Sequence, residues 1–156
     1  MKILFLDDNP NRRNKFKTNA IGCHVDFATT AQQCLELLQI SIQENQKYDL
    51  VCLDHDLGGP ESENNPIQDP QNNGMFVVER LTTPYYYNVY KDTSIIIHSL
   101  NHKGASNMYE RLRTVHYKEV HRIIMAWARF AKTDDGGYRF AEINSDIDPK
   151  ELSIAN

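Results

Sequence analysis

The stretch YDLVCLDHDLGG, residues 48–59, combines a short apolar run with an acidic end. Residues 50–53 are all of the type found in protein cores, and Asp54, His55 and Asp56 follow at once. A continuous apolar run of this length is typical of a parallel strand that is covered on both faces. The stretch therefore predicts a central strand whose carboxyl end carries ionisable side chains.

Apolar strands and segments of helical period alternate on both sides of this stretch. The predicted strands span residues 2–6, 24–28, 48–54 and 93–100, and the predicted helices span residues 9–20, 30–42, 74–83 and 104–115. Asn9 and Pro10 are typical of a helix start, and Thr30 with Gln33 forms a capping-box pattern. This order predicts an α/β fold, a three-layer, flavodoxin-like or receiver-like parallel sheet with helices on both faces and an extended C-terminal tail.

Three segments depart from the alternation. Residues 58–73 are polar and rich in Pro and Asn, and they form either a mobile lid or a disordered surface loop. Residues 120–125 begin either a fifth strand or an amphipathic helix, because their periodicity fits both. The sequence DDGG at 134–137 predicts a turn into one more strand at 138–143.

Composition limits the classes of protein to consider. A chain of 156 residues with 40% hydrophobic content predicts one domain, with a core at about 2–125 and an extension at 126–156. The formal net charge of -4 argues against a duplex-DNA binder.

The three cysteines are widely spaced among apolar residues, which is typical of reduced cysteines in a cytoplasmic protein. The apolar run at the start is too short for a signal or membrane segment, so we expect a cytoplasmic protein without membrane contact. The composition predicts no oligomeric state.

Acidic side chains follow two of the predicted strands. Asp7 and Asp8 end the first, and Asp54 and Asp56 end the third. The carboxyl ends of parallel strands meet at one edge of a sheet, so these groups should converge there. One strand-end aspartate alone is usually a cap or turn residue, but this coincidence favours a site. Clustered carboxylates repel, so one must have a raised pKa unless a cation or a basic side chain neutralises them. A hard divalent ion is the simplest counter-charge.

A histidine ends the apolar run of the fourth strand. His98 is either a satisfied core residue or a general acid or base near neutral pH. Ser99 should point to the opposite side of the strand, so only one of the two needs to face the crevice directly. Asn101 and Gly104 then open a helix with Lys103 nearby. Such a helix start is either ordinary or a set of free N–H groups that suits a phosphate.

These motifs resemble those of receiver domains. ILFLDDNPNRR at 3–13 is similar to the first strand of a receiver with its paired acids. Asp54 lies where the phosphoacceptor aspartate would be, and Ser99 lies where a hydroxyl residue ends the fourth strand. No apolar strand after residue 115 ends in the Lys-Pro pair that a phosphorylatable receiver uses.

A closer resemblance is to the receiver-like family described as cyclic-phosphate processing. It rests on the early Asp-Asp pair, LDHDLGG at 53–59, HSLNHKGASNM at 98–108, and Gly74 at the start of the third helix. The resemblance covers residues 2–115. It implies a role in handling cyclic phosphates on nucleotides or at nucleic-acid ends.

The residues supply each part that opening a cyclic phosphate needs: a proton acceptor, a proton donor and positive charge or N–H donors around phosphorus. We therefore predict a phosphoesterase that acts on a small nucleotide or an RNA terminus with a cyclic phosphate. We assign Asp7, Asp8 and Asp54 to the binding of Mg²⁺ or another divalent cation. His98 acts as the general acid or base, with His55 as a second candidate and Asp56 as the residue that orients a histidine. The predicted phosphate ligands are Ser99, Asn101, Lys103 and Gly104.

Two other functions stay open on the sequence. The same crevice suits a non-catalytic cyclic-nucleotide-binding module, a sensor or a sink in a bacterial or phage signalling conflict. In that case PYYYNVY at 84–90 stacks a base, unless its tyrosines pack against the sheet or a dimer partner. The other alternative is a degenerate response-regulator receiver domain that serves only protein interaction.

Overall fold

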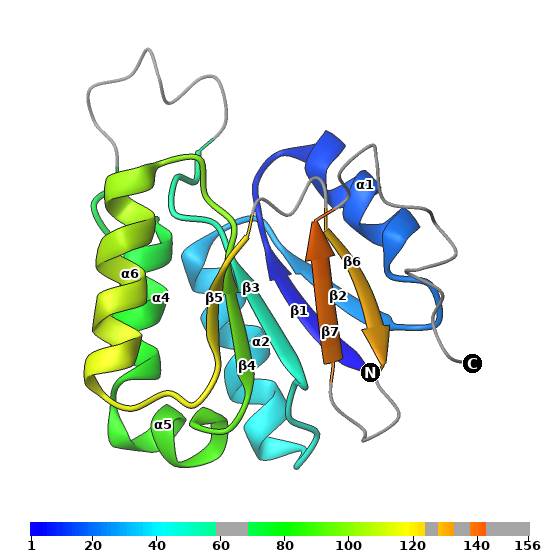
Figure 1. Cartoon of the computed structure of the whole chain (residues 1–156). Helices are drawn as coiled ribbons and strands as arrows, with labels where there is room; N and C mark the ends of the chain where they lie inside the picture. The colour runs from blue at the N-terminus through cyan, green and yellow to red at the C-terminus, as the bar shows by residue number, and fades with distance from the viewer. Residues whose placement is uncertain (59–68, 124–127, 133–137, 143–156) are drawn as a thin grey trace.

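The centre of the fold is a five-stranded parallel sheet with the strand order β2-β1-β3-β4-β5 (Figure 1). The structure, a computed structural model, describes residues 1–58, 69–123, 128–132 and 138–142. The strands are β1 (Lys2–Leu6), β2 (His24–Ala28), β3 (Leu50–Leu53), β4 (Ser94–Ile97) and β5 (Val120–Arg122). The four strands predicted from the sequence are confirmed, and their order is that of a flavodoxin-like sheet.

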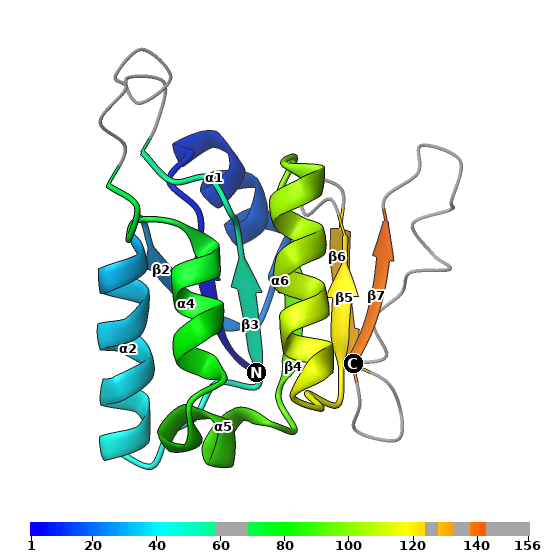
Figure 2. The ribbon, with the colours of Figure 1, turned by 90° about the vertical axis from the view of Figure 1, so that its left-hand side faces the viewer.

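Helices cover both faces of the sheet, which confirms the predicted three-layer fold (Figures 1 and 2). One face packs against α2 (Ala31–Gln43), α4 (Gly74–Leu81) and α6 (His102–Thr114) in the larger core. The other face packs against α1 (Pro10–Asn19) in a smaller core. The strands β1, β3 and β4 are buried on both faces, which explains their continuous apolar sequences.

Side-chain caps begin the first two helices where the sequence predicts. The Asn9 side chain accepts hydrogen bonds from two backbone N–H groups of α1, and Pro10 is the first helical residue. Thr30 accepts from the N–H of Gln33 at 3.1 Å. The Gln33 amide oxygen reaches back to the N–H of Thr29, at 2.9 Å, so the capping box extends one residue further than its usual form.

The tail forms a strand and a hairpin. Val120–Arg122 is β5, parallel to β4, so the strand interpretation of this segment is correct. Beyond it, β6 (Ala128–Lys132) and β7 (Tyr138–Glu142) pair antiparallel, and β6 runs beside α1. Three segments lie wholly or partly outside the described residues: the predicted turn at 134–137, most of the lid or surface loop at 58–73, and the end of the 120–125 segment. The domain division at about residue 125 stays a prediction.

The tyrosine-rich segment is a helix that the sequence analysis missed. This helix, α5 (Pro84–Tyr90), lies at the end of the sheet opposite to the carboxyl ends of the strands (Figure 1). Tyr90 is fully buried, and its hydroxyl shares a hydrogen bond with that of Ser41 in α2. The ring centroid of Tyr87 lies 5.5 Å from that of Tyr117. These contacts favour packing of the tyrosines in the fold over base stacking at the crevice.

The cysteines form no disulfide: Cys34 and Cys52 are buried and Cys23 is half-buried, all as free thiols. Burial raises the pKa of the Cys34 and Cys52 thiols. In the part of the chain that the structure describes, no helix has the length and apolar character needed to cross a membrane.

Candidate functional site

The register of the sheet brings Asp7, Asp54 and His98 side by side. The N–H of Asp54 donates to the carbonyl of Leu6, and the N–H of His98 donates to the carbonyl of Leu53, each at 3.0 Å. The hydrogen bonding between the neighbouring strands β1, β3 and β4 thus continues one residue beyond the end of the strands. The residue two positions before each of the three belongs to the smaller core under α1. Because side chains alternate along a strand, all three polar side chains lie on the α1 side of the sheet.

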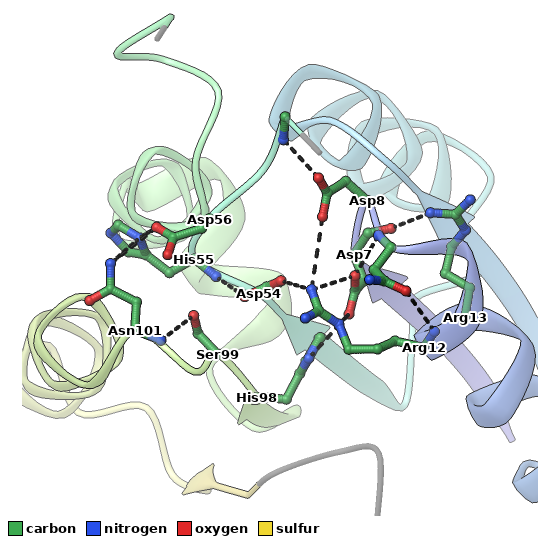
Figure 3. A network of polar contacts seen from close by, with 12 residues as sticks. Asp7, Asp8, Arg12, Arg13, Asp54, His55, Asp56, His98, Ser99 and Asn101 are labelled. Atoms are coloured by element: carbon green, nitrogen blue, oxygen red, sulfur yellow. Dashed lines mark hydrogen bonds and ion pairs between the residues drawn. The ribbon is translucent and has the colours of Figure 1, made fainter. Parts of the chain in front are cut away.

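The guanidinium of Arg12 lies among these acids (Figure 3). Its Nε donates to Asp7 Oδ2 at 2.7 Å, and its Nη2 donates to Asp7 Oδ1 at 2.8 Å and to Asp54 Oδ2 at 2.5 Å. The same Nη2 is 3.8 Å from Asp8 Oδ1. Asp7 is 0% exposed and Asp54 is 3% exposed, so Arg12 neutralises carboxylates that water does not reach.

The acids perturb one another in the way that the sequence predicts. Burial and the neighbouring charge of Asp7 raise the pKa of Asp54 to about 6, although Arg12 opposes the shift. Clustered carboxylates were expected to need either a raised pKa or a basic neighbour. The structure has both.

Further donors hold the acidic side chains in place. The acceptors are carboxylate oxygens of all three acids and one backbone carbonyl. The bonds run from Asn9 N to Asp7 Oδ1 (2.8 Å), from His55 N to Asp54 Oδ1 (2.7 Å), from Gly58 N to Asp8 Oδ2 (2.9 Å), and from Arg13 Nη1 to the Asp7 carbonyl (2.8 Å). The cluster is therefore fixed before any ligand binds.

The three predicted metal ligands fit a divalent cation. One carboxylate oxygen from each of Asp7, Asp8 and Asp54 lies within 4.8 Å of the others. Hard divalent cations prefer oxygen ligands of this kind, so the cluster can hold a metal ion. Asp56 is not part of this group, because its carboxylate turns toward His55.

His98 lies in the protein interior between an aromatic ring and an acid. Its ring stacks on Phe5 with the centroids 4.7 Å apart, and its Nδ1 is 3.6 Å from Asp7 Oδ2. Among the described residues, neither ring nitrogen has a hydrogen-bond partner. Burial lowers the pKa of His98 to about 4, although the charge of Asp7 opposes this shift. The imidazole is therefore neutral at pH 7, and only 1% of the side chain is exposed.

The His55 side chain is 21% exposed, so His55 is more accessible than His98. It lies beside Asp56 and Asn101 (Figure 3). Its Nδ1 donates to Asp56 Oδ1 at 2.6 Å, and the amide nitrogen of Asn101 donates to the same oxygen at 3.0 Å. The Asn101 carbonyl oxygen caps α6 by accepting from the N–H of Gly104 at 2.8 Å. Asn101 thus joins the helix start to the pair of His55 and Asp56. With Nδ1 occupied, Nε2 is the nitrogen left for proton transfer.

Two glycines allow this close packing. A Cβ on Gly104 would lie 2.5 Å from ring atoms of His55, and a Cβ on Gly74 would lie 2.0 Å from the carbonyl oxygen of Asp54. The N–H of Gly74 also donates to the carbonyl of His55 at 2.8 Å. A Cβ at either position would therefore force a shift of the atoms that it meets. This explains physically why glycine opens α4 and occurs in the first turn of α6.

Two of the remaining predicted phosphate ligands, Ser99 and Gly104, have local partners. Ser99 Oγ accepts from the N–H of Asn101 at 3.2 Å. Lys103 is exposed in the first turn of α6. The N–H of Gly104 already donates to Asn101, so it is occupied in this state. Binding of a phosphate by these residues stays a prediction.

Sequence reasoning missed Arg12 and Arg13. The segment that contains them was interpreted as an ordinary polar helix. One signal was available, because Asp8 and Arg12 are four residues apart at a helix start, a spacing at which opposite charges pair. The backbone contact of Arg13 has no comparable signal in the sequence.

A family model matches most of the chain. The model of the cyclic-phosphate processing receiver domain matches residues 2–114, which contain every residue of the site described above. No protein of curated function matches the chain.

Solved structures of response regulators have a similar fold. The Mn²⁺-bound form of the response regulator Rcp1 is 17% identical, with 78% of this chain and 79% of that chain covered and a TM-score of 0.48. NtrX from Brucella abortus in complex with ADP is also 17% identical, with 78% and 23% covered and a TM-score of 0.50. A response regulator receiver domain protein from Clostridium thermocellum is 19% identical, with 78% and 80% covered and a TM-score of 0.49. At such identities the likeness concerns the fold alone.

Proposed function

Because the chain belongs to the cyclic-phosphate processing receiver domain family, we propose that it is a phosphoesterase that opens cyclic phosphates of nucleotides or RNA ends. The observation that carries the proposal is the pair of His55 and Asp56, joined by a 2.6 Å hydrogen bond. The pair lies beside the start of α6 and next in sequence to the acidic cluster. A histidine held in this way by a carboxylate is suited to general acid–base chemistry near neutral pH.

In the proposed reaction, water attacks the phosphorus of a 2′,3′-cyclic phosphate. His55 Nε2 takes a proton from that water, while Asp56 holds the opposite nitrogen and stabilises the imidazolium that forms. One bond between phosphorus and a ribose oxygen then breaks, and His55 returns the proton to the leaving oxygen. The product is a phosphomonoester, so water is the only co-reactant.

Positive charge must offset the charge of the transition state. A divalent cation held by Asp7, Asp8 and Asp54 would polarise the phosphate oxygens when it is bound. We assign a contact with the phosphate to Lys103, which is exposed in the first turn of α6. The substrate in this proposal is small or a chain terminus, which agrees with the net charge of -4.

His98 is buried in the protein interior, whereas His55 is accessible to solvent. The His98 side chain is 1% exposed and its Nδ1 faces Asp7, so we assign the main proton transfer to His55 and a positioning role at Asp7 to His98. Proton transfer by His98 stays a prediction, and the variants described in the Discussion test it.

A phosphorus NMR time course tests the proposal. The full chain is mixed with 2′,3′-cyclic nucleotides or with RNA that ends in a cyclic phosphate, once with Mg²⁺ and once with a chelator. We expect a monoester signal that grows with the wild type and is lost in His55→Gln. The matched control is His24→Gln, because His24 also lies beside an aspartate, Asp26, at 3.1 Å, but in strand β2 away from the site.

A ligand signal that only shifts or broadens, with no monoester, would contradict the enzymatic proposal and favour a cyclic-nucleotide-binding module.

A second candidate function is phosphoryl acceptance by Asp54, favoured by its place beside Asp7 at the end of β3. Incubation with acetyl phosphate followed by mass spectrometry tests it. We expect no phosphoryl adduct, because Arg12 already bonds to Asp54. An adduct that disappears in Asp54→Asn would favour the receiver function.

A further inference from the structure

The position of Arg12 in the acidic cluster matters for the ion proposed above. Its Nη2 is 2.8 Å from Asp7, 2.5 Å from Asp54 and 3.8 Å from Asp8. These are the three residues whose oxygens converge within 4.8 Å as candidate metal ligands. One nitrogen of the guanidinium thus contacts or approaches the whole ligand set.

The oxygens that Arg12 uses are those that a cation would need. Both oxygens of Asp7 and one oxygen of Asp54 accept hydrogen bonds from Arg12. The second oxygen of Asp54 is turned to the N–H of His55. A divalent ion needs short contacts to these oxygens and would stand beside a guanidinium of like charge.

We propose that Arg12 is a built-in counter-ion that competes with a divalent cation for Asp7 and Asp54, so that the ion binds only when the guanidinium leaves. The inference rests on the ion-binding role in the proposed function, and it adds a control on that role. Arg12 keeps two buried carboxylates paired while no ion is present. Its side chain is 29% exposed, which gives the guanidinium a path out of the cluster toward solvent or a bound phosphate.

Binding of Mn²⁺ to the full chain tests the competition without any measurement of turnover. The signal of free Mn²⁺ in electron paramagnetic resonance gives the Kd for the wild type, Arg12→Gln and Arg13→Gln. Arg13 is the matched control, because it lies next to Arg12 and, within the part of the chain that the structure describes, donates only to the backbone carbonyl of Asp7. We expect the Kd of Arg12→Gln to fall at least tenfold, roughly the effect of removing one like charge from the ligand shell. The Kd of Arg13→Gln should stay within about threefold, because its guanidinium donates to no carboxylate oxygen in these contacts.

A second variant covers the case in which Arg12→Gln does not fold without an ion. Arg12→Lys keeps the charge but loses the two-pronged hydrogen bonding of the guanidinium. Its Kd for Mn²⁺ should lie between those of the wild type and Arg12→Gln, with the latter purified in Mn²⁺ if necessary. In the wild type, saturating Mg²⁺, which is diamagnetic, should also move the ¹⁵Nε resonance of Arg12 toward that of a solvent-exposed arginine.

Three outcomes would overturn the inference. They are an equal or weaker affinity in Arg12→Gln, an equal gain in Arg13→Gln, and an Arg12 resonance that does not respond to bound Mg²⁺. None of these readouts depends on turnover. A protein that binds Mn²⁺ as expected but leaves cyclic phosphates intact would contradict the proposed function and leave the competition standing.

Discussion

The imidazole of His55 lies against the backbone of Gly104, so close that a Cβ at residue 104 would be 2.5 Å from ring atoms. This contact joins the end of β3 to the first turn of α6. It also fixes the orientation of the ring, together with the hydrogen bond to Asp56. The geometry of the proposed acid–base group therefore depends on the absence of one methyl group.

Gly104→Ala should keep the fold and lose most of the activity. The atoms that the new Cβ meets belong to a side chain, which can rotate away, and alanine favours a helix by about 1 kcal/mol over glycine. A displacement of His55 by about 1 Å should lower kcat on a cyclic nucleotide about 100-fold. Phosphorus NMR measures turnover, and urea unfolding measures stability. Asn107→Ala, at an exposed position of the same helix, is the control. Normal turnover in Gly104→Ala would show that this contact does not position His55.

Gly74→Ala should instead damage the fold itself. Its Cβ would lie 2.0 Å from the carbonyl oxygen of Asp54, and the backbone of a central strand cannot move as a side chain can. We expect a loss of about 3 kcal/mol in the free energy of unfolding, from overpacking and from displacement of the N–H bond to His55. Urea titration compares it with Gly104→Ala, the same change against a movable neighbour. Equal losses in the two variants would contradict this distinction.

Asn101→Asp separates two roles of one side chain. Aspartate caps a helix as well as asparagine does, so the hydrogen bond from the N–H of Gly104 and the stability should persist within about 0.5 kcal/mol. The amide donor to Asp56 is lost, and two carboxylates come together in its place. We expect turnover to fall about 10-fold to 100-fold, as for other residues that orient a functional group. Asn101→Ala should lose both properties. Unchanged turnover in Asn101→Asp would remove its amide from the positioning of His55.

Two substitutions of His98 distinguish packing from proton transfer. His98→Phe keeps an aromatic ring on Phe5, whereas His98→Ala leaves a cavity in the interior. We expect His98→Ala to lose about 2 to 4 kcal/mol of stability and His98→Phe to lose clearly less. If His55 is the main acid–base group, His98→Phe should retain measurable turnover. Loss of all turnover in a stable His98→Phe protein would return the proton transfer to His98.

The fold was predictable because its central strands are buried on both faces. A parallel sheet between two layers of helices has continuous apolar runs such as that of β3, and such runs are visible without a structure. The fifth strand was ambiguous, since three residues, Val120–Arg122, are too few to show a period. The helix α5 was missed because four tyrosines in seven residues show no polar face.

The site was predictable where it depends on strand ends and not where it depends on helix faces. Asp7, Asp54 and His98 follow from the register of parallel strands, which any βαβ pattern implies. Arg12 comes from a helix whose rotation about its axis the sequence leaves open, so its insertion among the acids appears only in the structure. The different environments of His98 and His55 follow from packing by Phe5 and Gly104, which are distant in sequence.

The hydroxyl pair of Ser41 and Tyr90 provides a test of the role of α5. Ser41 Oγ donates to the carbonyl of Leu38 at 2.7 Å, so the Tyr90 hydroxyl is the donor in the bond between them. Ser41→Ala leaves that buried donor without its partner and should cost about 1 to 3 kcal/mol. Tyr90→Phe removes the donor and leaves Ser41 bonded to Leu38, so it should cost less, about 1 kcal/mol. Urea unfolding orders the two variants, and both should turn over cyclic nucleotides normally because α5 lies at the far end of the sheet (Figure 1). A turnover defect in stable Tyr90→Phe protein would instead connect the tyrosine segment to the site.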